Sequence, residues 1–196
     1  MRTNYSNSDF DKIVLGIDPG TNIMGYGVIG MIGKEMTMLS MGILEMRKLE
    51  DHAQKLNFIF ERVTAIINQY EPHEMAIEAP FYGKNVQSML KLGRAQGVAI
   101  AAGLQKNIPI FEYTPKKIKL TVSGNGNASK EQVAEMLSRL LKFENDAQFF
   151  DATDALGAAV CHITQFTPRK FGNKTTANKG GWGNFIKNNP NRIKKQ

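Results

Sequence analysis

Four carboxylates stand where short apolar segments of this chain end: Asp18, Glu78, Asp151 and Asp154. Each lies in or beside an otherwise uncharged run, which reads IVLGIDPGT, MAIEAPF or DATDALGAAVC. An acid at the edge of a core is costly to bury unless it binds something positive. Acids contributed by well-separated parts of the chain therefore predict a shared metal site.

Asp151 and Asp154 are three residues apart at the expected start of a helix, so both side chains project from about one face. The positive end of a helix favours negative charge at this place. Asp151 alone is also open to interpretation as a helix N-cap. Asp154 is not, because its neighbours Ala155 and Leu156 indicate a buried surface where an unpaired charge needs a partner.

Oxygen donors of this kind suit the hard ions Mg²⁺ and Mn²⁺. Four carboxylates carry more negative charge than one divalent ion neutralises. Two ions about 3.5–4 Å apart would balance that charge and stabilise the attacking and leaving oxygens of a phosphodiester hydrolysis. The sequence offers no zinc alternative, because His52, His73 and His162 are scattered and are expected at the surface or in helix packing.

A length of 196 residues suits one α/β core and is too short for two ordinary domains. No segment approaches the roughly 20 apolar residues that span a bilayer, and the N-terminus lacks the apolar core of a secretory signal. The single cysteine, Cys161, excludes an internal disulfide and is typical of a reducing compartment. We therefore expect a cytoplasmic protein without a membrane partner.

The net charge of +7 is spread unevenly along the chain. Residues 79–130 contain eight basic residues and a single acid, Glu112. A basic segment beside an acidic remainder fits a surface that binds phosphates around an acidic centre, and a solvated basic face without a role is the alternative. The last 30 residues are rich in Gly, Asn and Lys, so we expect them to be disordered alone.

Hydrophobic periodicity and turn residues divide the chain into strands and helices. The expected strands are 12–18, 25–31, 35–46, 75–78 and 108–113. The expected helices are 49–70, 85–106, 115–118, 129–141 and 151–166. We summarise the order as βββαβαβαα, which predicts an α/β fold with a mixed five-stranded sheet flanked by helices. Three regions follow: a disordered extension (1–11), a folded domain (12–166) and a basic, disordered tail (167–196).

Five blocks of sequence together resemble the RuvC Holliday-junction resolvases, which are bacterial homodimeric endonucleases of the RNase H-like superfamily. The blocks are LGIDPGTNIMGYGVI, AIEAPFYGKN, LKLGRAQGVAIAA, FEYTPKKIKLTVSGNGNASKEQV and DATDALGAAVCH. The resemblance implies an RNase H-like nuclease domain that cuts one DNA strand at a junction crossover. It also implies two Mg²⁺ ions, with Mn²⁺ as a substitute, bound by the catalytic residues Asp18, Glu78, Asp151 and Asp154.

The resemblance further implies residues that bind DNA. Lys119 and Lys130 match family lysines that assist DNA binding and catalysis. Phe81 matches an aromatic that stacks on a base near the junction point, an interaction worth about 1–3 kcal/mol; a core or dimer-contact role is its alternative. The other basic residues expected to follow the phosphates are Lys84, Lys91, Arg94, Lys116 and Lys117.

The family forms homodimers through the region that corresponds to residues 85–106. Two-fold symmetry would let two active sites nick opposed strands of a four-way junction. The resemblance also implies a bacterial, nucleoid-associated protein that acts in homologous recombination and DNA repair beside the branch-migration complex of RuvA and RuvB. The tail 167–196 lies outside the resemblance, and Trp182 and Phe185 leave it open as a DNA tether or a solubilising segment.

Other functions fit the sequence less well. Asp-Pro-Gly-Thr after a strand is similar to the first phosphate loop of actin-like ATPases and sugar kinases, but the chain has no room for their second domain. A non-catalytic junction-binding protein would not need all four acids. An RNase H-like nuclease acting on another structured nucleic acid stays open. The sequence favours a structure-selective endodeoxyribonuclease that resolves four-way junctions by paired symmetric nicks.

Overall fold

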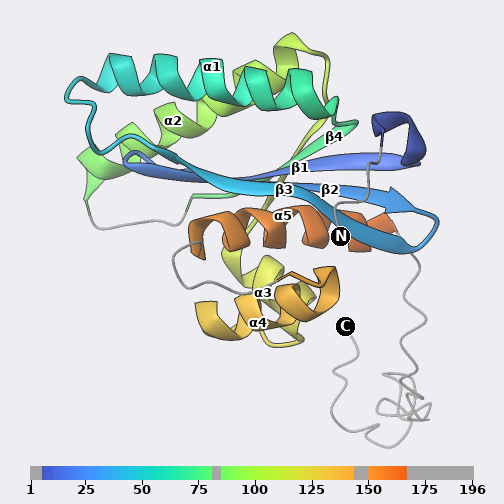
Figure 1. Cartoon of the computed structure of the whole chain (residues 1–196). Coiled ribbons are helices and arrows are strands. Elements are labelled where there is room, and N and C mark those ends of the chain that lie inside the picture. Colours follow the sequence, from blue (N-terminus) through green and yellow to red (C-terminus); the bar gives the residue numbers. More distant parts are fainter. Residues whose placement is uncertain (1–5, 81–84, 144–149, 167–196) are drawn as a thin grey trace, which may run out of the picture.

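The computed structural model describes residues 6–80, 85–143 and 150–166. Its centre is a mixed five-stranded sheet in the order β3-β2-β1-β4-β5, with helices on both faces (Figure 1). β2 is antiparallel to β1 and to β3, whereas β4 is parallel to β1 and to β5. The strands are β1 (Lys12–Asp18), β2 (Ile23–Ile32), β3 (Glu35–Glu45), β4 (Glu74–Glu78) and β5 (Ile110–Tyr113). The predicted α/β fold is confirmed.

Two helices cover one face of the sheet and three cover the other (Figure 1). The first face carries α1 (His52–Tyr70) and α2 (Val86–Gln105), and the second carries α5 (Phe150–Phe166) with α3 (Pro115–Ser123) and α4 (Lys130–Leu141) against it. Each face has its own apolar core, which explains why β1 is a nearly continuous apolar run. Among these described residues, no helix is both long enough and apolar enough to cross a membrane.

Local signals account for the helix ends. The Asp51 side chain accepts a hydrogen bond from Gln54 N at the start of α1, and Ser129 and Gln132 form the predicted capping box at the start of α4. The helix expected to stop at Ile118 instead continues as α3 to Ser123 and ends at a left-handed Gly124. The three helices that follow β5 thus match the three expected ranges, of which the summarised order counted only two.

The N-terminal extension corrects one prediction, because residues 6–11 are ordered rather than disordered. Residues 7–9 form a 3₁₀ turn, and Phe10 is buried against Gly30, where a β-carbon would collide with its ring. Asp11 accepts a hydrogen bond from Gly33 N at 2.6 Å. Burial of the large Phe10 ring stabilises this otherwise polar segment against the domain. Residues 1–5 and the tail 167–196 lie outside the described residues.

The glycines of β1 and β2 set how closely α5 approaches the sheet. A β-carbon at Gly16 would collide with the carbonyl oxygen of Ala155, and one at Gly25 would collide with the carbonyl oxygen of Asp151. Small residues on both sides therefore bring the backbone of α5 directly onto these strands. This close packing positions the first turn of α5 at the end of β1.

Candidate metal centre

Two of the predicted carboxylates end neighbouring parallel strands. Asp18 is the last residue of β1 and Glu78 is the last residue of β4. The residues before them, Ile17 and Ile77, are paired in the sheet and belong to the core under α1 and α2. Because side chains alternate between the two faces of a strand, Asp18 and Glu78 point to the opposite face, which α5 covers.

The helix α5 brings the other two acids to this edge of the sheet. Asp151 lies in its first turn, and Asp154 follows three residues later. Asp18, Asp151 and Asp154 each present one carboxylate oxygen, and these oxygens lie within 4.8 Å of one another. Glu78 is not part of this set of three, but its charge reaches Asp18. The structure thus brings the four predicted acids together, three as one cluster and Glu78 beside it.

The pKa values of the cluster show that nearby positive charges offset only part of the burial and mutual repulsion of its carboxylates. Burial, followed by the charges of Glu78 and Asp154, raises the pKa of Asp18 to about 8. Burial and the charge of Asp154 raise the pKa of Glu78 to about 7. Burial also raises the pKa of Asp154, although Lys130 opposes the shift. A set of crowded carboxylate oxygens with raised pKa values fits a hard divalent cation.

Two of the predicted lysines lie at this cluster. Lys130, the first residue of α4, places Nζ 2.5 Å from Asp154 Oδ2 and 4.0 Å from Asp151 Oδ1. The positive charge of Lys119, on α3, opposes the rise in the pKa values of Glu78 and Asp154. These lysines come from the two small helices that pack against α5, so α3 and α4 supply the positively charged side chains beside the carboxylates.

The other predicted DNA-binding residues are spread over the surface. Lys91 and Arg94 are exposed on α2, which covers the opposite face of the sheet from α5. Lys116 and Lys117 are exposed in the first turn of α3. Phe81 and Lys84 lie outside the described residues. The described basic side chains thus occur on both sides of the edge that carries the acids.

A buried polar network at the other end of α5 was not predicted. The fully buried His162 contacts Tyr113 Oη through Nδ1 at 2.7 Å and Glu74 Oε2 through Nε2 at 2.6 Å. Lys12 Nζ lies 2.8 Å from the same Glu74 oxygen. This network ties α5 to β1, β4 and β5. The expectation of a helix-packing histidine fits its place, but no sequence signal pairs residues 88 positions apart.

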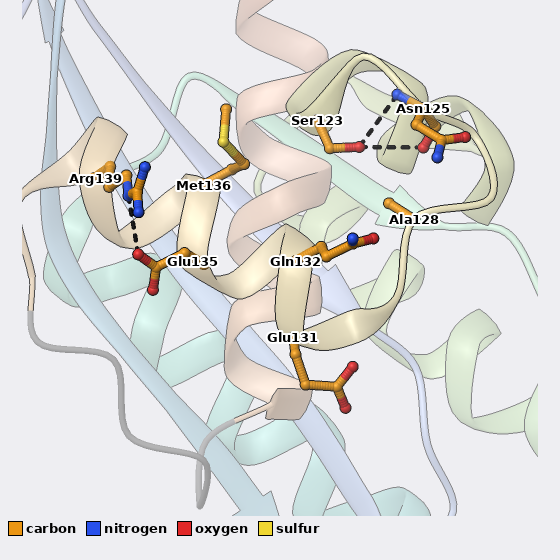
Figure 2. Close-up of a pocket in the computed structure, with 8 residues that line it drawn as sticks. All are labelled: Ser123, Asn125, Ala128, Glu131, Gln132, Glu135, Met136 and Arg139. Atoms are coloured by element: carbon orange, nitrogen blue, oxygen red, sulfur yellow. Dashed lines mark hydrogen bonds and ion pairs between the residues drawn. The ribbon is translucent and has the colours of Figure 1, made fainter.

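A hollow on α4 does not take part in this centre. Figure 2 shows it between the loop after α3 and one side of α4, with Glu131, Glu135 and Arg139 among the side chains that line it. Glu135 is paired with Arg139 at 2.9 Å. None of the four predicted carboxylates lines this hollow, so it is separate from the acid cluster.

The chain matches a known protein family over most of its length. The family described as "Crossover junction endodeoxyribonuclease RuvC" matches residues 14–162. The crossover junction endodeoxyribonuclease RuvC of Cytophaga hutchinsonii is 58% identical over 194 residues, which cover 99% of this chain and 94% of that protein. That of Bacteroides fragilis is 56% identical over 188 residues, which cover 94% of this chain and 97% of that protein.

The fold is also similar to a solved complex, T. thermophilus RuvC with a Holliday junction substrate. The TM-score is 0.73 and the sequence identity is 27%, over 78% of this chain and 93% of that chain. A second Thermus thermophilus RuvC structure gives a TM-score of 0.70 at 28% identity, over 77% of this chain and 93% of that chain. The family resemblance and the RNase H-like fold predicted from the sequence are confirmed.

Proposed function

Because the chain belongs to the RuvC family of crossover junction endodeoxyribonucleases, we propose that it resolves four-way DNA junctions by metal-dependent hydrolysis at the acid cluster. The observation that carries this proposal is the convergence of Asp18, Asp151 and Asp154 within 4.8 Å, with Glu78 beside them. Acids with raised pKa values at a strand edge, flanked by lysines, suit chemistry on a phosphodiester. The chain is a nuclease of recombination and repair.

We propose that Asp18, Glu78, Asp151 and Asp154 hold two Mg²⁺ ions, for which Mn²⁺ can substitute. Bound ions of this kind lower the pKa of a water and offset the charge that develops on the phosphate. The protein's part is to fix the ligands on two strand ends and one helix, so that they need little rearrangement. We propose that Lys119 and Lys130 contact phosphate oxygens at the same edge.

We propose that the chain works as a homodimer formed through α2. One stripe of this helix is exposed along its length: Val86, Leu90, Gly93, Gly97, Ala101 and Leu104. The spacing of three and four residues places these positions on one face, and the large apolar members are unusual on a free surface. Nothing in the described structure stands in front of Gly93 or Gly97, which leaves room for a second helix to approach closely.

The exposed bases support contacts with the junction arms. Lys91 and Arg94 would follow phosphates from α2, and Lys116 and Lys117 from the start of α3. Phe81 as a stacking residue, Lys84 as a phosphate contact and the tail 167–196 as a tether remain predictions. We also propose action beside RuvA and RuvB in the cytoplasm, at the nucleoid, where the DNA substrate is found.

A panel of substrates tests the proposed function. The purified protein is incubated with a mobile four-way junction, a linear duplex and an RNA–DNA hybrid, each with Mg²⁺ or with EDTA. We expect symmetric, metal-dependent nicks in the junction alone. Cleavage of the hybrid in place of the junction would point to a different RNase H-like nuclease, and binding without cleavage would point to a non-catalytic junction-binding protein.

A further inference from the structure

A second hollow lies on the α2 side of the sheet, at the residues that follow the ends of β4 and β5. Its volume is about 670 Å³, within the range of about 300–1,000 Å³ that is usual for small-ligand sites. Its walls are mainly apolar and include Pro80, Met89 and Pro115. Four polar side chains, those of Gln96, Glu112, Thr114 and Lys116, also line it. The functions proposed above leave this hollow without an occupant.

The hollow opens at the same edge of the sheet as the acid cluster. Ala79 and Pro80, which line it, directly follow Glu78 at the end of β4. Ala79 N donates a hydrogen bond to Tyr113 O at 2.8 Å, so this segment stays alongside the end of β5. A DNA strand that binds at the carboxylates and continues around the ends of β4 and β5 would reach this hollow on the other face.

The polar groups of the hollow form a directional pair. Gln96 is only 6% exposed, and its Nε2 donates a hydrogen bond to Glu112 Oε2 at 3.0 Å. This bond fixes the buried amide relative to the carboxylate. Glu112 has a second carboxylate oxygen, and the Gln96 amide has a further N–H and a carbonyl oxygen. Together they offer hydrogen-bond acceptors with a donor beside them, next to apolar walls.

The chemistry of these groups selects the part of a DNA strand that fits. The carboxylate of Glu112 repels a phosphate, so the charged backbone stays outside, where the exposed Lys116 can pair with it. A base is flat, uncharged and edged with hydrogen-bonding groups, which suits apolar walls with a polar pair. Carboxylates accept from the amino group of cytosine, and glutamine pairs with adenine.

We propose that the hollow holds one unstacked base next to the cleaved phosphate, and that Gln96 and Glu112 recognise an exocyclic amino group on it, as in cytosine or adenine. This inference rests on the proposed function, because it requires junction DNA at the acid cluster. Gln96 and Glu112 would then set part of the sequence preference of cleavage, while the acids perform the hydrolysis.

Cleavage rates on a set of four-way junctions test this proposal. The junctions differ only in the base at each position that flanks the cut, and single-turnover rates are compared for the wild-type protein, Gln96→Met and Glu112→Gln. The matched control is Glu135→Gln, which makes the same chemical change in the hollow of Figure 2. We expect the wild type to prefer an amino-bearing base at one flanking position. In both hollow variants, the ratio of the rate on the preferred junction to the rate on the others should fall roughly tenfold. In the control, this ratio should be unchanged.

A second measurement needs no variant. The wild-type protein is given junctions in which the preferred base carries hydrogen in place of its amino group, and we expect a roughly tenfold lower rate. An unchanged rate on these junctions would overturn the proposal, as would a wild type that prefers no base at any flanking position. A wild type that cuts no junction would instead overturn the proposed function, so the two failures are distinguishable.

Discussion

Lys130 Nζ lies 2.5 Å from Asp154 Oδ2 and is the cation in direct contact with the acid cluster among the described residues. The contact joins the start of α4 to the start of α5. Because the ammonium group lies beside ligands that a metal ion would use, it competes with the ion for the same negative charge. We propose that the same side chain also contacts a phosphate of bound DNA.

This competition predicts opposite effects of Lys130→Met on metal binding and on cleavage. Without DNA, the variant should bind Mn²⁺ several-fold more tightly, since a competing positive charge is gone. With junction DNA it should cut more slowly, since the phosphate loses a partner. Calorimetric titration with Mn²⁺ and single-turnover cleavage measure the two effects. Weaker Mn²⁺ binding by the variant would mean that Lys130 does not compete with the ion.

The raised pKa values predict how the metal-free protein responds to pH. The pKa of Asp18 rises from 3.8 to about 8 and that of Glu78 from 4.5 to about 7. Between the ordinary pKa and the raised pKa of each group, the folded state binds more protons than the unfolded state. The free energy of unfolding therefore decreases as pH rises from about 4 to about 8. Asp18→Asn should therefore raise the melting temperature at pH 8 by at least about 2–4 °C, equivalent to about 1 kcal/mol.

Metal should remove this penalty, so Mg²⁺ should raise the melting temperature more at pH 8 than at pH 5, where Asp18 and Glu78 are largely protonated. Thermal unfolding followed by circular dichroism, with Mg²⁺ and with EDTA, measures both effects. The control is Asp51→Asn at the start of α1, which removes a carboxylate outside the cluster. A melting temperature of Asp18→Asn below that of the wild type at pH 8 would contradict the proposed repulsion.

The contact between Gly16 and α5 predicts a sharp loss of activity from a small substitution. Gly16→Ala directs a methyl group at the carbonyl oxygen of Ala155, which is backbone and cannot rotate away. We expect a cost of about 1–3 kcal/mol in stability, with Asp151 and Asp154 displaced from Asp18. Cleavage should fall more than junction binding does. Ala65→Ser is the control, because it adds one atom at an exposed position of α1, away from the acid cluster and from the α2 stripe. Equal activity of both variants would contradict this packing.

The stripe on α2 predicts that a charge at its centre separates the dimer. Gly97 is exposed with open space before it, so Gly97→Asp should fold normally as a monomer while burying an unpaired charge between two copies. Light scattering should give the monomer mass for the variant and the dimer mass for the wild type. Ser88→Asp adds the same charge at another exposed position of α2 and should remain dimeric. A dimeric Gly97→Asp would place the interface elsewhere.

Signals local in sequence predicted most of the fold. The apolar runs of β1 and β4 and the capping box at Ser129 mark their elements directly, and the four acids stand out because each interrupts an apolar run. Long-range contacts left no such trace. Phe10 is ordered by packing on Gly30, and Gln96 meets Glu112 only after α2 folds onto the sheet. Both pairs depend on tertiary packing, which periodicity does not report.

The rate at which Asp18→Asn cuts a four-way junction is the most direct test of the central claim, that these carboxylates perform the hydrolysis. The protein concentration should saturate junction binding, so that the rate reports chemistry alone. We predict paired, Mg²⁺-dependent nicks by the wild type and a rate at least about a thousandfold lower for Asp18→Asn, with binding retained, because metal ligands supply several kcal/mol of transition-state stabilisation. Cleavage by Asp18→Asn at the wild-type rate would contradict the assignment of the site.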